Sequence, residues 1–123
     1  MNQRDLKART FEFALNVTKL IPQLPNSVWN RIYFSQLIRS SSSVGINYRA
    51  SQRAKSDRDF INKLKIVDEE ADECIYFLEL LLVLNKDYSH LIVPLVNEGT
   101  EILKMIVASI NTKRVRMADQ KKI

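Results

Sequence analysis

Residues 36–73 read QLIRSSSSVGINYRASQRAKSDRDFINKLKIVDEEADE and carry the features that decide the fold. A run of small residues, Ser40 to Gly45, is followed by a basic segment and then by an acidic block. Ser56 precedes Asp59 by three residues, which is a variant of the capping box that marks a helix start, with Asp where Glu is preferred. The stretch therefore predicts two helices joined by a short turn just before Ser56.

The helix after this turn has the most regular apolar repeat in the chain. Its apolar positions alternate four- and three-residue steps, as in a coiled coil, and they are Phe60, Leu64, Val67, Ala71, Cys74, Leu78 and Leu81. Beyond Cys74 nearly every residue is apolar, so either neighbouring helices or another subunit must cover the additional faces. We expect a subunit interface formed by Ile75, Tyr76, Phe77, Leu80 and Val83.

The helix before the turn has one face that narrows from large to small residues. At 100° per residue this face holds Tyr33, Leu37, Ser40, Val44, Tyr48 and Ser51. A neighbouring backbone can approach closely where the small side chains lie. Gly45 costs up to about 1 kcal/mol relative to Ala inside a helix, so we expect a packing reason for it.

Two further amphipathic helices flank this pair. Leu6, Phe13, Val17 and Leu20 mark the first, which Pro22 and Pro25 end. The inner face of the last holds Ile92, Leu95, Gly99, Ile102, Ile106 and Ile110. We predict an all-α, up-down-up-down antiparallel four-helix bundle with helices at about 3–21, 27–53, 57–85 and 89–117. Residues 1–123 form one domain in this prediction, with a short basic C-terminal tail that frays.

Cysteine content and the lengths of the apolar runs indicate the cellular compartment. A single Cys74 cannot form an intrachain disulfide, and charged residues interrupt the N-terminal apolar positions, so no signal peptide is expected. The longest apolar run, residues 74–84, is far shorter than the roughly 20 residues that span a bilayer. We expect a cytoplasmic protein without a membrane span.

The net charge of +5 is distributed unevenly along the chain. Residues 1–60 carry ten Lys and Arg against four Asp and Glu, and residues 102–123 carry six against one. Residues 61–101 carry three against nine. Basic regions of this kind can meet a polyanion, while the acidic middle can neutralise arginines of the same chain or of a neighbour.

An arginine stripe runs along one side of the second helix, away from its apolar face. It consists of Arg31, Arg39, Arg49 and Arg53, and Lys55 and Arg58 extend it past the turn. One interpretation is a phosphate-binding strip. The other is ion pairing, because in an antiparallel hairpin Arg39 lies near the level of Ala71 and could meet Asp68, Asp72 or a neighbouring subunit's acids. Both interpretations stay open.

The C-terminal residues Lys113, Arg114 and Arg116 have no matching acids nearby in sequence. They are candidates for phosphate contacts, although a basic last turn also suits the helix dipole. The sequence has no RNA-recognition signature with aromatic residues on strands. Any nucleic-acid binding is therefore expected to be electrostatic and weakly sequence-specific.

Catalytic and metal sites find little support in the sequence. A ferritin-like metal site needs Glu-x-x-His on two helices, and the one histidine, His90, falls in a predicted turn. Cys74 lies on an apolar seam with no histidine to act as its base. We predict no metal, no cofactor and no enzymatic activity, and we interpret Trp29, Tyr33 and Phe34 as core or interface anchors rather than a ligand box.

The pattern resembles the family of small four-helix-bundle proteins encoded in intervening sequences of bacterial 23S ribosomal RNA genes. The resemblance is carried by residues 36–40, 43–47, 49–56, 59–60, 63–73 and 76–82. Many members have Glu-Gly shortly after the asparagine, whereas Tyr48, Arg49 and Ala50 follow Asn47 here, as in another branch. The family includes the basic pentameric accessory variability protein of retroelements, which binds nucleic acid and reverse transcriptase.

The resemblance implies a homo-oligomer in the form of a ring of five bundles, and it offers no catalytic residues to carry over. Two hypotheses about function follow. The first is a non-enzymatic oligomer that binds RNA or another nucleic acid through basic surfaces. The alternative is a protein-interaction scaffold whose arginines serve subunit assembly around an unidentified protein partner.

Overall fold

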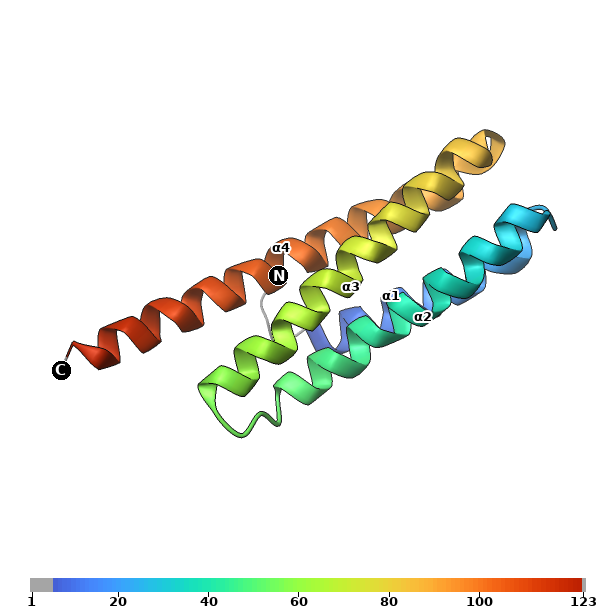
Figure 1. Ribbon diagram of the computed structural model, residues 1–123. Coiled ribbons are helices and arrows are strands. Elements are labelled where there is room, and N and C mark those ends of the chain that lie inside the picture. The colour runs from blue at the N-terminus through green and yellow to red at the C-terminus, as the bar shows by residue number, and fades with distance from the viewer. Residues whose placement is uncertain (1–5, 123) are drawn as a thin grey trace.

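A computed structural model describes residues 6–122 of the chain. The four helices are α1 (Leu6–Leu20), α2 (Val28–Ser51), α3 (Asp57–Leu84) and α4 (Ser89–Lys121), and two short 3-10 turns, η2 (Ile21–Gln23) and η3 (Lys86–Tyr88), lie in the connections (Figure 1). The predicted all-α fold is confirmed. Residues 3–5 of the first predicted helix lie outside the described part. The predicted end at 117 was wrong, because α4 stays helical to Lys121.

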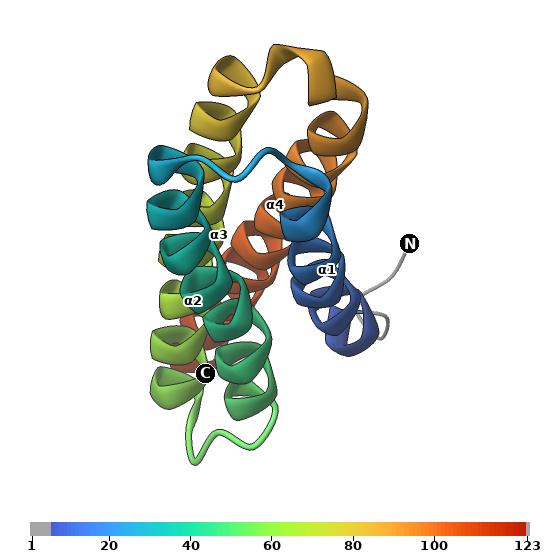
Figure 2. The same cartoon turned by 90° about the vertical axis from the view of Figure 1, so that its right-hand side faces the viewer.

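Each helix packs beside two others, which closes the bundle. α1 contacts α2 and α4, and α3 contacts the same two helices from the opposite side (Figures 1 and 2). Short connections make sequential helices antiparallel neighbours, as the up-down-up-down topology requires. The arrangement brings the start of α1, the end of α2 and the start of α3 to the same end of the bundle (Figure 2).

Serine side chains cap the two central helices, and the cap at Ser56 is the one that the sequence predicted. The Ser27 hydroxyl accepts a hydrogen bond from the Asn30 amide at 3.1 Å, which caps α2. At the start of α3, the Ser56 hydroxyl accepts from the Asp59 amide at 3.1 Å, and the Asp59 carboxylate accepts from the Lys55 amide at 3.1 Å. Both helix starts thus satisfy amide groups that would otherwise lack partners.

The core follows the predicted faces with two exceptions, one of which is on α2, where Phe34 is buried and Tyr33 is only partly covered. Every predicted inner residue of α4 is buried, and so is the α3 seam from Leu64 to Leu81. At its beginning, Ile61 is buried where Phe60 was predicted, and Phe60 is only partly covered. At 100° per residue, Phe60 and Ile61 lie about 40° and 60° from Leu64, on opposite sides of it. Both therefore border the buried face, and the rotation of α3 against its neighbours decides that Ile61 is the one covered.

The small residues of α2 lie against both neighbouring helices, since Ser40 contacts Cys74 of α3 and Gly45 lies beside Thr10 of α1, where it has room. A Cβ built on Gly45 would meet its nearest neighbour, the Thr10 backbone oxygen, at 3.7 Å, which is ordinary contact. A Cβ on Gly99 would lie 3.3 Å from Ile75 Cγ1 and 3.4 Å from Phe13 Cζ, which is tight. Close packing thus accounts for Gly99 and does not require a glycine at position 45.

A buried amide pair joins two helix ends that are distant in sequence. Asn30 Nδ2 donates to Asn85 Oδ1 at 2.9 Å, and Asn85 Nδ2 donates back to Asn30 Oδ1 at 3.0 Å. The same two amide groups donate to the carbonyls of Pro25 and Leu81 at 2.9 and 2.8 Å. The pair ties the α1–α2 connection to the end of α3.

The last turns of α4 extend past the rest of the bundle. The buried residues of α4 end at Ile110, whereas the helix continues to Lys121, and Figure 1 shows its red end projecting beyond the α2–α3 turn. None of the helices in the described part is both long and apolar enough to cross a membrane.

Candidate nucleic-acid interface

The structure gathers most of the predicted basic residues at one end of the bundle. Exposed residues of the α2–α3 turn and of the last turns of α4 make up this basic end, which consists of Arg49, Arg53, Lys55, Arg58, Arg114, Arg116, Lys121 and Lys122. Within residues 6–122, none of their side chains forms an ion pair with an acid. Their charge is therefore available to an external anion.

Lys113 connects the two halves of the basic end. Its ammonium lies 3.1 Å from Asp57 Oδ1, at the first residue of α3, and 5.1 Å from the centroid of the Phe60 ring. Lys113 has no matching acid nearby in sequence, but folding supplies one, because Asp57 is 56 residues away along the chain. Lys113 thus fixes α4 against the turn, and Arg114 and Arg116 follow directly beyond that contact.

Arg39 is committed to acids of its own chain. Its guanidinium donates to Glu73 Oε2 and lies 3.3 Å from Glu70 Oε2. The hydrogen bond to Glu73 raises the pKa of Arg39 further. The predicted partners Asp68 and Asp72 were wrong: each is two residues from Glu70, which places it about 160° around α3, away from α2.

Arg31 also lies apart from the basic end. It is near the start of α2, at the opposite end of the bundle, where it donates to Asn26 Oδ1 at 2.8 Å. The predicted stripe therefore divides into three parts. Arg39 pairs with acids, Arg31 is isolated, and Arg49 and Arg53 join the basic end.

The acidic block on α3 does not form a metal centre. Among residues 6–122 no group of three His, Cys, Asp or Glu side chains is arranged to hold a metal ion. Burial and the neighbouring Asp72 and Glu69 raise the pKa of Asp68, and burial likewise raises that of Glu70. Two acids of the block, Glu70 and Glu73, pair with Arg39, and Asp68 and Asp72 lie on the other side of α3.

Cys74 behaves as a small core residue. It is fully buried and its sulfur donates to Ser40 Oγ at 3.3 Å. Burial raises the pKa of the thiol to about 12, so the thiolate needed for nucleophilic chemistry is scarce at neutral pH.

The predicted subunit-interface residues separate into covered and exposed ones. Ile75 lies against Gly99 of α4, and the Phe77 ring packs 5.9 Å from the Tyr33 ring of α2, so neighbouring helices partly cover both. Leu80 is half-buried, whereas Tyr76 and Val83 are exposed. Exposed apolar residues that the interface prediction omitted lie nearby, where α2 begins beside the end of α3. We use the name apolar face for the set of Val28, Trp29, Ile32, Tyr76, Val83 and Leu84.

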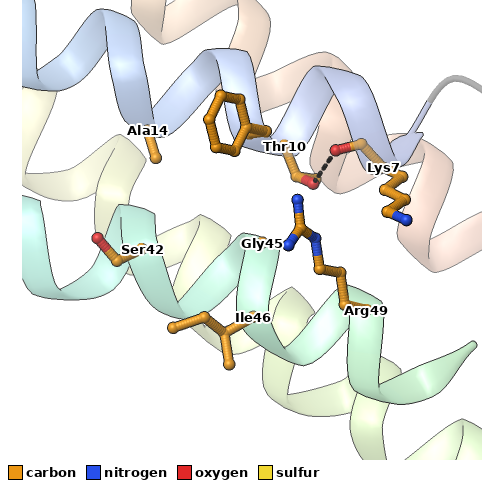
Figure 3. Close-up of a pocket in the computed structure, with 8 residues that line it drawn as sticks. Lys7, Thr10, Ala14, Ser42, Gly45, Ile46 and Arg49 are labelled. Atoms are coloured by element: carbon orange, nitrogen blue, oxygen red, sulfur yellow. Dashed lines mark hydrogen bonds between the residues drawn. The ribbon is translucent and has the colours of Figure 1, made fainter. Parts of the chain in front are cut away.

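Sequence reasoning missed a groove between α1 and α2, next to the basic end. It has a volume of about 260 Å³ and is lined by Lys7, Thr10, Phe11, Ala14, Ser42, Gly45, Ile46 and Arg49 (Figure 3). Small residues on both helices leave the space open. Phe11, which lies outside the apolar periodicity of its helix, was the one signal in the sequence. The Arg49 guanidinium lies 5.9 Å from the centroid of the Phe11 ring, within cation–π range.

Comparison with known proteins agrees with the fold. The profile of the family described as 23S rRNA-intervening sequence protein matches residues 3–108. The chain belongs to this family. A crystal structure from Bacteroides thetaiotaomicron, described as a protein with unknown function from the S23 ribosomal protein family, is 35% identical with a TM-score of 0.77, covering 85% of this chain and 97% of that one. No curated protein matches.

The match to the 23S rRNA-intervening sequence protein family includes only one of the two parts of the basic end. The α2–α3 turn and the α1–α2 groove fall inside the matched residues 3–108. The basic residues of α4, from Lys113 onward, lie beyond the match. Some of the phosphate-binding candidates thus lie in the region shared with the family, and the others lie in a segment beyond it.

Proposed function

We propose that this protein is a non-enzymatic, homo-oligomeric helical bundle that binds RNA electrostatically through its basic end. One observation carries the proposal: the basic residues of the α2–α3 turn and of α4, separated by more than fifty residues in sequence, meet at one end without acid partners among residues 6–122. A phosphate backbone is the polyanion that such a surface suits, and family membership makes RNA the first nucleic acid to test.

The shape of the basic end favours contacts to the backbone over reading of base sequence. Its side chains are spread over a turn and the ends of three helices. A-form RNA also presents its major groove too narrowly for side chains to read. We therefore expect binding that depends on salt and on charge, with little preference among sequences, and we expect it to take place in the cytoplasm.

The test compares Arg53, two residues past the end of α2, with Arg31, near the start of α2. Arg53 belongs to the basic end, whereas Arg31 is exposed at the other end, so Arg53→Gln and Arg31→Gln remove the same charge from different places. A labelled, structured fragment of 23S ribosomal RNA is titrated at several salt concentrations from about 50 mM upward. Each lost phosphate contact lowers the slope of log K against log salt by about 0.7–0.9.

We expect Arg53→Gln to weaken binding and to lower this slope, and Arg31→Gln to change neither. Equal effects of the two variants would show that only net charge matters and would overturn the assignment to the basic end. Absence of binding by the unaltered protein at about 50 mM salt would overturn RNA binding itself.

Self-assembly is the second part of the proposal, and the apolar face supports it. Large exposed apolar residues that are close together normally mark a contact surface. Within one chain, α1 packs against α2 and α4 packs against α3, and neither helix covers the apolar face. A second copy of this chain is the partner that we propose for it, with a ring of five as the assembly that the family likeness implies.

Two exposed valines give a matched test of assembly. Val83, on the apolar face, is 66% exposed, and Val115, on the projecting end of α4, is 60% exposed. Analytical ultracentrifugation should show Val83→Asp dissociating the oligomer and Val115→Asp leaving it intact. If neither variant changes the sedimentation coefficient, the apolar face is free for another protein, which would favour the alternative of an interaction scaffold.

A further inference from the structure

The groove between α1 and α2 combines a wall of apolar side chains with two cations. Phe11, Ala14 and Ile46 supply apolar surface, and Lys7 and Arg49 lie toward one end of it (Figure 3). A neighbouring hollow is lined by Ala8 and Glu12 and shares Phe11 and both cations. The groove itself is thus lined by positive charge without an acid, next to a ring that is 55% exposed.

We propose that this groove holds one unpaired base of a bound RNA, with the adjoining phosphates on Lys7 and Arg49. The proposal rests on RNA binding at the basic end and assigns that site a preference for single strands. An exposed aromatic ring beside a guanidinium offers a flat surface on which any base can stack, and the sequence-tolerant binding of single strands uses this combination. A paired base inside a duplex cannot reach the groove.

The size and position of the groove favour a nucleotide over other occupants. A volume of about 260 Å³ is below the roughly 300–1,000 Å³ of pockets for drug-sized ligands, so it suits a single ring system. Arg49 belongs both to the groove and to the basic end, and Arg53 follows four residues later, in the turn just past the end of α2. A chain of phosphates can therefore continue from the groove onto the basic end, which a single carboxylate head group does not do.

Two pairs of variants separate the groove from general electrostatics without changing any charge. Ser42→Leu fills the groove, and Ser35→Leu places the same side chain one heptad earlier on the exposed side of α2, outside it. Phe11→Ala removes the ring, and Leu15→Ala removes an exposed apolar side chain one turn later that does not line the groove. Circular dichroism of all four variants verifies that they fold.

Affinity is measured at fixed low salt for a 12-nucleotide unstructured RNA and for a 12-base-pair RNA duplex. We expect Ser42→Leu and Phe11→Ala to lose about tenfold in affinity for the single strand, the size of one stacked base, and less than about twofold for the duplex. Ser35→Leu and Leu15→Ala should match the unaltered protein on both. Equal losses on both RNAs, or no loss on either, would overturn the groove proposal while leaving RNA binding in place.

A direct titration with small molecules tests the groove independently of the RNA strands. Adenosine monophosphate and decanoate are each added to the unaltered protein, and amide NMR shifts of Ala14, Ser42 and Gly45 are followed. Shifts with adenosine monophosphate that Ser42→Leu abolishes support the proposal. Shifts with decanoate alone would overturn it in favour of an amphipathic carboxylate. Failure of the unaltered protein to bind either RNA or the mononucleotide would overturn both the groove and the proposed function.

Discussion

The Asn30–Asn85 pair should be the most costly polar contact in the bundle to break. Asn30 is fully buried and takes part in three side-chain hydrogen bonds, to Pro25 and twice with Asn85. Each contributes about 1 kcal/mol net, and truncation leaves buried groups of Asn85 and Pro25 without partners. We expect Asn30→Ala to lower the free energy of unfolding by about 3 kcal/mol, a large part of the roughly 5–15 kcal/mol that a domain of this kind possesses.

The same reasoning gives a double-mutant cycle. Asn85→Ala also removes three hydrogen bonds, two of them shared with Asn30, so it should cost about 3 kcal/mol by itself. Once one partner is gone, the second truncation has less to lose. The double variant should therefore be less destabilised than the sum of the singles, with a coupling free energy of about 2 kcal/mol.

Urea denaturation followed by circular dichroism measures all three variants. Asn47→Ala is the control, because the Asn47 amide donates only to Ser43 of its own helix at 2.9 and 3.0 Å, and it should change stability by less than about 1 kcal/mol. Single variants that cost no more than the control would refute the reasoning. Additive singles within about 0.5 kcal/mol would also refute it, because they would mean that the two amides do not act as a unit.

Three further predictions follow from contacts in the core and on α2. Gly45→Ala should raise the free energy of unfolding by about 0.5–1 kcal/mol in urea denaturation, because alanine favours the helix and its methyl meets only ordinary contacts. Gly99→Ala should gain less or lose stability, because its Cβ would lie 3.3 Å from Ile75. Equal gains for the two variants would contradict this. The buried Cys74 thiol, with a pKa of about 12, should resist iodoacetamide at pH 8 and react fully in urea, so rapid native labelling would contradict its assignment to the core. Arg39→Gln should change the urea midpoint little, because solvent screens the ion pairs of its half-exposed side chain, and should leave RNA affinity unchanged, which filter binding can check against the Arg53→Gln variant.

Local patterns in the sequence were enough for the helices and their starts. The capping roles of Ser27 and Ser56 depend on amides three residues away, and the apolar seams depend on the helical period. Both are properties of a single segment, so no tertiary information is needed. The end of α4 was the exception, since a basic and polar composition indicated fraying where the helix in fact continues to Lys121.

The candidate site depended on distances between segments, which periodicity does not contain. The sequence could place Arg39 near the middle of α3, but the rotation of α3 decided that Glu70 and Glu73 face it. In the same way, packing alone brought Lys113 to Asp57 and Asn30 to Asn85.

What the sequence determined by itself is the bundle: four helices, their caps and most of their buried faces, all set by interactions within a few residues. What only the tertiary structure decided is which charges are neutralised and which remain available. Axial shift and rotation between packed helices set those pairings, and they depend on how every side chain in the core fills space. The basic end, the apolar face and the α1–α2 groove are consequences of that packing.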